Sequence, residues 1–569
     1  MKKTLPLIFL CILHTFLSYA QSINWQWVET ASGDEQEGYA VATDANGNIY
    51  LTGAFACTGT GDSAYFGTNA IITAPGSWTT FLAKYSSSGT ALWAKTAVVS
   101  SNEQSTGGLV TTGKSGNVYL AGAFTGDSLI YGNTNLGYAN MHNNNLFLVN
   151  YDSLGNVLWA KRLGDSLSSV SPGGIAADQQ GNVFLTGYFT GDSVVFGATT
   201  LFNTGVGFFV IKYDSAGNVV WVQSNNSQSS AIQPSGIAVD ETGSIFVTGA
   251  FGDTLAVDSI VLYNTNPHTN EIFLLRYNEA GRVIWGRAAS GVYNNSQVNG
   301  IATDGNGNSF ITGAFVGDSL VFGPYNLRGD TLNAIFIVKY DSSGNASWAK
   351  KAGGDKGNND IGYGVAASRE GNCYLSGSIS SDSITFDPIT LHYPTSYMNL
   401  GDPMFVVSLD PNGNAICADA VVSGGDDVNA ICVDKYGDVY VGGDLTPVVR
   451  TIFGKDTINP SATSEFAFLA KFNCSKEASG LLNLNETHLL QIYPNPFSNR
   501  AIVNYALPPG TKNATLIVYD LAGRQRDTYK LPNTETQITI NASKLCTGLY
   551  FYSLVVDGRV IDTKKMVVE

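Results

Sequence analysis

Three features of this 569-residue sequence predict an all-β protein. A unit of about 65 residues recurs along most of the chain, which is typical of a repeat architecture. Within each unit, apolar and polar residues alternate on both sides of Gly-containing turns, as they do in paired β-strands. A separate segment of short alternating strands ends the chain. Together these features predict a seven-bladed β-propeller followed by a small Ig-like β-sandwich.

The first half of each unit carries the pattern Gly–apolar–Ala–x–Asp–x–x–Gly–Asn–apolar–aromatic–apolar–Thr–Gly–x–Phe. In this pattern, the Asp side chain can cap a turn and Gly can adopt the left-handed conformation, so the segment predicts a β-hairpin. The copies begin at Gly38, Gly108, Gly174, Gly236, Gly300, Gly364 and, in a weaker form, Asn429.

The second half of each unit carries the pattern Phe–apolar–x–Lys–Tyr–Asp–x–x–Gly–Asn–x–x–Trp, for example from Phe336 to Trp348. It predicts a second hairpin, and two hairpins supply the four strands of one propeller blade. A Gly-Asp-Ser/Thr element lies between the two patterns. We interpret it as a turn and a short extra strand at the rim.

The ends of the repeat region predict how the ring closes. The sixth unit has Cys417 where the preceding units have Trp, and the seventh unit stops near Asn473 without a Trp strand. The N-terminal segment supplies a spare copy, because Trp27 precedes Trp93 by 66 residues, in phase with the repeat. We therefore expect the N-terminal strand to complete the last blade and to pair its otherwise open edge.

The recurring tryptophans each occupy one fixed position in their unit, which favours a structural lock between blades over a carbohydrate-stacking platform. These residues are Trp27, Trp93, Trp159, Trp221, Trp285 and Trp348.

The periodicity changes after Cys474. A polar linker leads to Ile492–Asn499, where two nearby prolines predict an extended entry rather than a central strand. Short alternating segments follow and predict a small antiparallel sandwich. They are Ala501–Tyr505, Ala514–Asp520, Gln537–Ile540, Gly548–Val556 and Arg559–Val568.

The N-terminal segment has the features of a secretory signal peptide. Lys2 and Lys3 precede a largely apolar run from Leu5 to Leu17, and small residues at 18–20 suit cleavage. No later run reaches 18 apolar residues, so no transmembrane segment is expected. The predicted organisation is a signal peptide (1–20), a propeller (21–474), a linker (475–488) and a C-terminal domain (489–569).

The repeat motifs resemble the bacterial SBBP-type β-propeller repeat family, whose units carry similar GIAVD–GNVYVTG and KYDxxGNxxW segments. The C-terminal domain resembles the type A sorting domain of type IX secretion, through the YPNP, VYDLAGR, GLY and KMVV segments. The residues that carry this second resemblance include Pro494, Asn495, Pro496, Gly523, Gly548 and Lys565.

The second resemblance implies a Bacteroidetes-type bacterium. It also implies the type IX secretion machinery as a partner, and a product that is secreted or attached to the cell surface, with this domain removed or retained.

The net charge and the histidine content exclude some classes of function. With 31 Lys+Arg against 46 Asp+Glu, the net charge of −15 repels phosphate backbones, so nucleic-acid binding is not expected. Only five histidines are present, which is poor material for a catalytic triad or a His-rich metal site. We assign no catalytic residue and no cofactor.

Two Asp-x-Asn-Gly-Asn runs could bind calcium, because carboxylate and amide oxygens are suitable ligands. The candidate ligands are Asp44, Asn46, Asp304 and Asn306. Gly stands at the fourth position of each run, however, where an EF-hand loop has it at the sixth. A hairpin turn is therefore the preferred interpretation of both runs.

Cysteine spacing leaves disulfide pairing open. No CxxC pair occurs, and a bond such as Cys417–Cys432 or a set of free buried cysteines would both fit.

The favoured function is a non-enzymatic binding scaffold for a glycan, a protein or an envelope component. A secreted polysaccharide hydrolase or lyase and a purely structural envelope protein are the alternatives. The sequence does not indicate an oligomeric state.

Overall fold

The computed structural model describes residues 23–568, with gaps. The gaps are 34, 57–62, 75, 100–103, 114, 127, 138–143, 165–167, 204, 226–231, 265, 267–268, 293–294, 330–331, 354–358, 393–401, 422–427, 447–450, 460–464, 475–489, 494, 506, 508–512, 521–523, 533–536 and 557–558. The predicted signal peptide and linker lie outside the described residues.

The fold is all-β, as the sequence predicts. The described residues contain β-strands and one short 3₁₀ turn, Ala542–Lys544. They contain no helix that is long and apolar enough to cross a membrane. The chain divides into two compact units, of which one is Ala20–Ser475 and the other contains Lys476–Glu569.

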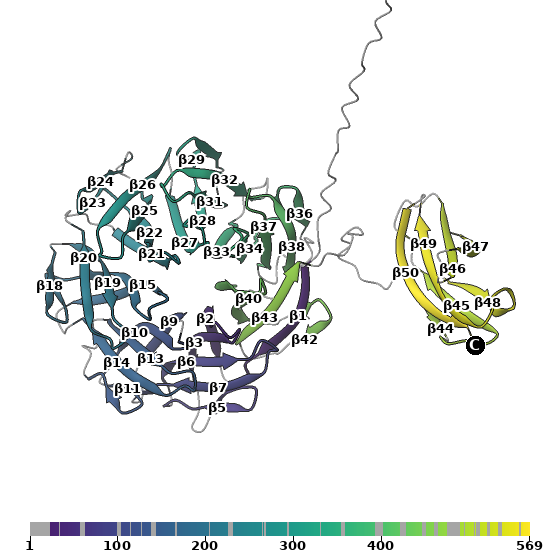
Figure 1. The fold of residues 1–569 in the computed structure, drawn as a ribbon, viewed down its shortest axis with the longest axis horizontal. Helices are drawn as coiled ribbons and strands as arrows, with labels where there is room; N and C mark the ends of the chain where they lie inside the picture. The colour runs from purple at the N-terminus through teal and green to yellow at the C-terminus, as the bar shows by residue number, and fades with distance from the viewer. Residues whose placement is uncertain are drawn as a thin grey trace, which may run out of the picture. The chain divides into compact units, whose positions relative to one another are not determined.

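The larger unit is built from groups of four antiparallel strands, one group for each repeat, that follow one another along the chain (Figure 1). The first three repeats form β2 (Gln36–Thr43), β3 (Ile49–Ala56), β6 (Trp78–Tyr85) and β7 (Ala91–Thr96); β9 (Gln104–Thr112), β10 (Val118–Thr125), β13 (Asn145–Tyr151) and β14 (Val157–Leu163); and β15 (Ser169–Ala177), β16 (Val183–Thr190), β19 (Val206–Tyr213) and β20 (Val219–Ser224). A single bridge between β6 and β9 joins the first two repeats into one sheet.

The next three repeats have the same order. They form β21 (Ile232–Val239), β22 (Ile245–Phe251), β25 (Glu271–Tyr277) and β26 (Val283–Val292); β27 (Asn295–Thr303), β28 (Ser309–Val316), β31 (Ala334–Tyr340) and β32 (Ala346–Ala352); and β33 (Ile361–Ala367), β34 (Cys373–Ser378), β37 (Met404–Leu409) and β38 (Ala415–Val421).

The seventh repeat takes its outer strand from the other end of the chain. It contains β39 (Ala430–Val433), β40 (Val439–Leu445) and β43 (Phe466–Cys474), and β1 (Ile23–Thr30) pairs antiparallel with β43. Trp27 lies opposite Lys471 in this pairing, as Trp93 lies opposite Lys84 in the first repeat. The N-terminal strand thus occupies the fourth-strand position of the seventh sheet.

The first strands of the repeats lie next to one another. Contacts join β2 to β9, β9 to β15, β15 to β21, β21 to β27, β27 to β33, β33 to β39, and β39 back to β2. Figure 1 shows these strands nearest the centre of the arrangement. The second and third strands are buried on both faces, because the sheets pack against their neighbours; every residue of β3, for example, is buried.

An additional two-stranded hairpin follows the second strand of each repeat. The sequence predicts one short extra strand here, and the structure shows two. Their apolar residues, such as Phe66 and Phe196, pack on the third strand of the same repeat. The hairpins are β4 (Ala64–Phe66)/β5 (Asn69–Ile71), β11 (Leu129–Tyr131)/β12 (Thr134–Asn135), β17 (Ser193–Phe196)/β18 (Thr199–Phe202), β23 (Thr254–Val257)/β24 (Ile260–Tyr263), β29 (Ser319–Phe322)/β30 (Tyr325–Arg328), β35 (Ser383–Phe386)/β36 (Ile389–His392) and β41 (Thr451–Phe453)/β42 (Asp456–Ile458).

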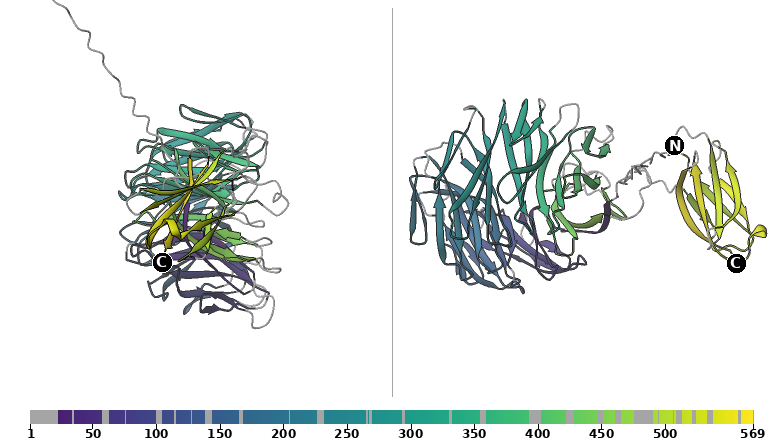
Figure 2. Two further views of the ribbon diagram at one scale, coloured as in Figure 1. Left: turned by 90° about the vertical axis from the view of Figure 1, so that its right-hand side faces the viewer. Right: turned by 45° about the horizontal axis from the view of Figure 1, so that its top comes forward.

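The C-terminal unit contains two antiparallel sheets that share one hydrophobic core, and Figure 2 shows it from two directions. One sheet is β44 (Leu490–Tyr493), β45 (Arg500–Tyr505) and β48 (Gln537–Asn541). The other is β47 (Gln525–Leu531), β46 (Ala514–Asp520), β49 (Gly548–Val556) and β50 (Arg559–Val568). The sequence does not reveal β44 or β47. The β47 segment, QRDTYKL, is too polar to stand out because it is an edge strand with exposed residues.

Candidate functional site

The two candidate calcium loops are hydrogen-bonded hairpin turns. Asp44 Oδ1 accepts the backbone N–H groups of Asn46 (2.8 Å) and Asn48 (3.0 Å), and its Oδ2 accepts the Asn48 amide (2.8 Å) and the Tyr50 hydroxyl (3.0 Å). Both carboxylate oxygens of Asp44 are therefore already engaged.

The second loop repeats this geometry. Asp304 Oδ1 accepts the backbone N–H groups of Asn306 (2.8 Å) and Asn308 (3.1 Å), and its Oδ2 accepts the Asn308 amide (2.7 Å). A lysine approaches each carboxylate, with Lys84 Nζ 3.9 Å from Asp44 and Lys339 Nζ 4.0 Å from Asp304.

In each of the two turns, a lysine ammonium group thus offsets the negative charge of the aspartate. Among the described residues, no group of three or more His, Cys, Asp and Glu side chains is placed to hold a metal ion. Calcium binding stays a prediction.

The six predicted tryptophans lie at the interfaces between successive repeats. Each indole N–H donates to a backbone carbonyl in the turn between the third and fourth strands of the next repeat, at 3.0–3.3 Å. The donor–acceptor pairs are Trp27–Ser87, Trp93–Ser153, Trp159–Ser215, Trp221–Glu279, Trp285–Ser342 and Trp348–Pro411.

The turn glycine of the next repeat lies directly against each indole ring. Gly281 has φ +79°, and a Cβ there would lie 2.8 Å from a ring carbon of Trp221. Gly413 has φ +81°, and a Cβ there would lie 2.9 Å from Trp348. Glycine is therefore required for two reasons, the left-handed backbone and the close approach of the ring.

A basic side chain reinforces several of these interfaces. Lys84 Nζ donates to Ser153 O (2.9 Å), the carbonyl that also accepts Trp93, and Lys339 Nζ lies 3.4 Å from Pro411 O. Arg276 donates to Ser342 O in the same way. One turn carbonyl thus collects two donors from the preceding repeat.

The interface between the sixth and seventh repeats is built differently, and sequence reasoning missed it. Cys417 forms a disulfide with Cys474, whereas Cys432, the partner considered from the sequence, is free. Beside this bond, the Trp25 indole N–H donates to Asp419 Oδ2 at 2.7 Å. The occurrence of Cys417 at a tryptophan position was the available signal.

Other candidate residues are dispersed. His392 ends β36, and the other four histidines lie outside the described residues. A groove of about 430 Å³ lies between the second and third repeats, lined in part by Lys161, Arg162, Tyr213 and Asn218. Its two cationic side chains would suit an anionic group.

The described sorting-motif residues converge on the last strand. The Asn495 side-chain amide donates to Lys565 O (3.1 Å), and its Oδ1 accepts the backbone N–H of Val567 (2.8 Å). Gly548 pairs with Val568, and Pro496 lies next to Asn495 in the chain. Pro494 and Gly523 lie outside the described residues.

Comparison with known protein families identifies two segments. Residues 491–569 match the family described as secretion system C-terminal sorting domain, and residues 158–192 match the β-propeller repeat family, SBBP. Both resemblances noted in the motifs are therefore confirmed for these segments.

A relative that aligns over a longer part of the chain has low sequence identity to it. An uncharacterized WD repeat-containing protein of Acanthamoeba polyphaga mimivirus is 26% identical over 390 residues. The match covers 55% of this chain and 27% of that protein, so this chain spans about a quarter of its length.

Two solved structures show only weak similarity. One is a DUF4221 family member from Bacteroides vulgatus (11% identity, TM-score 0.30, 80% of this chain and 99% of that one). The other is the extracellular domain of a putative hybrid two-component system from B. thetaiotaomicron (11%, TM-score 0.17, 96% and 99%).

Trp348 provides a test of the interface hydrogen bond. Trp348→Phe keeps an aromatic ring but removes the N–H donor, so we expect a loss of about 1 kcal/mol in the free energy of unfolding. Trp348→Ala also removes the packed ring and should cost about 3 kcal/mol or more. Calorimetry of both variants measures the difference. Ser347→Ala is the control, because Ser347 directly precedes Trp348 and is exposed. Equal losses of stability in Trp348→Phe and Trp348→Ala would contradict the expectation.

Asp214 provides a test of the turn capping. The backbone N–H of Asn218 and its side-chain amide hold the pKa of Asp214 below its ordinary value. A depressed carboxyl pKa contributes stability above the unfolded-state value, near 4, and that contribution is lost as the pH falls through the folded-state value.

We therefore expect Asp214→Asn to lower the melting temperature at pH 7 and to have a vanishing effect in acid. Glu370→Gln is the control, because Glu370 is exposed and lies in a turn that begins with Ser368 rather than with an Asp. A pH-independent effect of Asp214→Asn would exclude this role.

Trp25 provides a third test. Burial raises the pKa of Asp419, although the Trp25 N–H opposes the shift. Ionisation of Asp419 therefore destabilises the fold as the pH rises through the folded-state pKa of this carboxyl group. The Trp25 N–H reduces this cost, because it stabilises the ionised carboxylate. Trp25→Phe should therefore destabilise more at neutral pH than in acid. Trp27→Phe is the matched control, because its N–H binds a carbonyl and its loss should not depend on pH.

Proposed function

We propose that this protein is a closed seven-bladed β-propeller, exported through the type IX route, that acts outside the cell as a non-enzymatic scaffold for binding a glycan. The C-terminal sorting domain supports export and interaction with the secretion machinery. The β-propeller repeat match supports the architecture of the larger unit.

Ring closure is supported from both ends of the chain. The contacts between first strands return from β39 to β2, and β1 supplies the fourth strand of the seventh sheet. Across the same interface, the Asn429 side-chain amide donates to Gly38 O at 2.9 Å, and Trp27 donates to Ser87 O. In this proposal, the propeller spans residues 21–474 and is preceded by a signal peptide at 1–20. A linker at 475–488 joins it to the sorting domain at 489–569.

One observation carries the binding role: apolar side chains are exposed at the same position in four consecutive repeats. Each directly precedes the interface tryptophan, so strand alternation turns it to the outward face. They are Leu92, Leu158, Val220 and Ile284, each about half exposed. Apolar side chains exposed at a repeated position favour interaction of this surface with a partner.

Exposed aromatic rings on the neighbouring hairpins support a glycan in particular. Phe202 ends β18 and is 79% exposed, and Tyr263 ends β24 at the equivalent position of the next repeat and is 67% exposed. A flat apolar ring with little conformational freedom can stack on the apolar face of a sugar.

The test is a thermal-shift screen of the purified full-length protein against a polysaccharide panel. A ligand that binds the folded state raises the melting temperature. Phe202→Ala/Tyr263→Ala should weaken binding of an active glycan by about tenfold or more. Tyr436→Ala is the matched control, because Tyr436 is equally exposed but lies in a turn elsewhere.

Two outcomes would refute the proposal. One is the absence of a shift with any glycan, and the other is equal weakening by the control variant. Analysis of products in the same wells checks for cleavage, which would favour an enzyme instead. A fall in melting temperature with EDTA alone, reversed by added calcium, would favour the calcium prediction.

A further inference from the structure

The interface between the sixth and seventh repeats lacks the tryptophan donor of the six interfaces described above and the basic donor that several of them share. Cys417 pairs with Ser408 across β38 and β37, as Trp348 pairs with Lys339 one repeat earlier. Cys417 therefore occupies the tryptophan position, and Ser408 occupies a position that holds Lys or Arg in five of the repeats. Neither side chain can reproduce the contacts of an indole or an ammonium group.

The acceptor side of this interface has changed as well. In the first repeat, the residue three positions after Lys84 is Ser87, whose carbonyl accepts the tryptophan of the preceding sheet. The corresponding residue after Lys471 is Cys474. The disulfide therefore joins the tryptophan position of one repeat to the acceptor position of the next.

The reason lies in the exchanged strand. Because β1 supplies the fourth strand of the seventh sheet, both neighbours of β43 in that sheet, β40 and β1, precede it in the chain. The position that holds the turn glycine in the other repeats is Lys476 here. A tryptophan at position 417 would lack the glycine on which the other indole rings pack, and no hairpin joins β43 to its fourth strand, β1.

We propose that the Cys417–Cys474 disulfide is a redox-dependent latch. It closes the interface between the sixth and seventh repeats in place of the tryptophan–turn contact, and it holds the two ends of the propeller chain together. The Cα atoms lie 5.9 Å apart, within the range that a disulfide spans.

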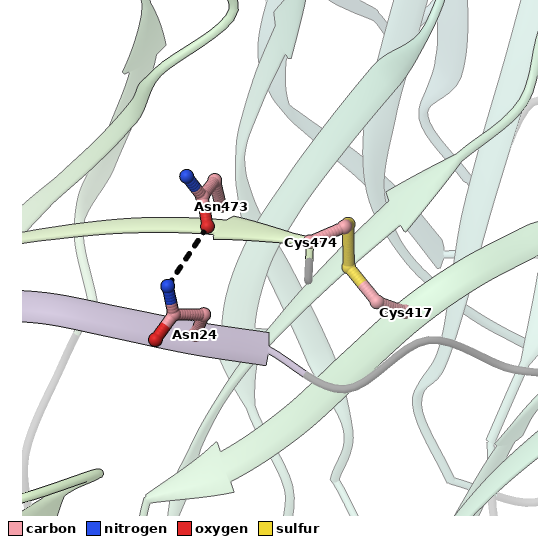
Figure 3. The surroundings of a disulfide bond; sticks show 4 residues. All are labelled: Asn24, Cys417, Asn473 and Cys474. Carbon is pink, nitrogen blue, oxygen red and sulfur yellow. Dashed lines mark hydrogen bonds between the residues drawn. A yellow bond between two sulfur atoms is a disulfide. The ribbon is translucent and has the colours of Figure 1, made fainter. Parts of the chain in front are cut away.

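Both ends of the propeller chain meet at this latch (Figure 3). Ile23, the first residue of β1, pairs with Cys474, the last residue of β43, and the Asn24 side-chain amide donates to Asn473 Oδ1 at 3.3 Å. Chain ends fray unless they are tied down. A covalent bond to β38 in the neighbouring repeat prevents β43 and β1 from peeling away together.

The latch forms by thiol–disulfide exchange with a disulfide oxidant such as oxidised glutathione. The Cys417 and Cys474 thiols each give up a proton and together two electrons, one S–S bond forms between them, and the oxidant leaves as two glutathione thiols. A dithiol reductant reverses the reaction.

The two free cysteines that the structure describes in the larger unit are poor competitors for this exchange. Cys373 lies in β34 and Cys432 in β39, and burial raises the pKa of both thiols. Since the thiolate is the attacking species, these two cysteines react slowly.

Hydrogen–deuterium exchange on the full-length protein tests the latch. The protein is oxidised with glutathione disulfide or reduced with dithiothreitol, and peptide mapping first establishes whether Cys417 and Cys474 are bonded. We expect reduction to increase exchange in β1, β38 and β43 by about tenfold or more, with little change in β15–β20. The melting temperature should fall by several degrees.

Cys417→Ser/Cys474→Ser should reproduce the reduced state and no longer respond to dithiothreitol. Cys432→Ser is the matched control and should keep the full response. Absence of the bond in the oxidised protein, equal exchange in both states, or an increase spread evenly over all repeats would overturn the proposal. If the double variant fails to fold, the reduced and oxidised forms of the Cys432→Ser protein provide the same comparison.

Discussion

The architecture of the larger unit depends on the contact between an indole ring and the turn of the next repeat. The ring lies on a glycine that has no room for a Cβ, and its N–H satisfies a turn carbonyl. Because one residue supplies both packing and a directional bond, each contact sets the spacing and the rotation between neighbouring sheets. In the turn that accepts Trp348, Asp410 Oδ1 accepts the backbone N–H groups of Asn412 and Asn414, which helps to hold the acceptor carbonyl in place.

These contacts cannot continue unchanged where the propeller segment of the chain begins and ends. Pairing β1 with β43 supplies the missing fourth strand and places Trp27 at the interface with the first repeat. With β1 in this place, no hairpin joins β43 to its fourth strand, so the seventh sheet differs from the others where the sixth repeat would place a tryptophan. A disulfide and the buried Trp25–Asp419 hydrogen bond stand at that interface instead. The strand that closes one interface thus changes the chemistry of the adjacent one.

Strand alternation divides each fourth strand between stability and exposure. The tryptophan turns toward the neighbouring repeat, and the residue before it turns to solvent, as Trp159 and Leu158 illustrate. The Asp carboxylates in the turns between the first and second strands are buried and accept hydrogen bonds, so part of the negative charge of the chain lies inside the fold. The outer surface is therefore where repeated side chains remain available to a partner.

The sequence by itself determined the all-β class, the hairpin turns and the tryptophan phase, because each follows from residues close together in one repeat. The alignment of Trp27 with Trp93 even placed the N-terminal strand opposite β43. The partner of Cys417 could not be found in this way, since it depends on which strands become neighbours in the folded chain. The docking of Asn495 on the last strand, 70 residues along the chain, is likewise decided by packing. Only the tertiary structure brings such distant positions together, because no periodic pattern records them.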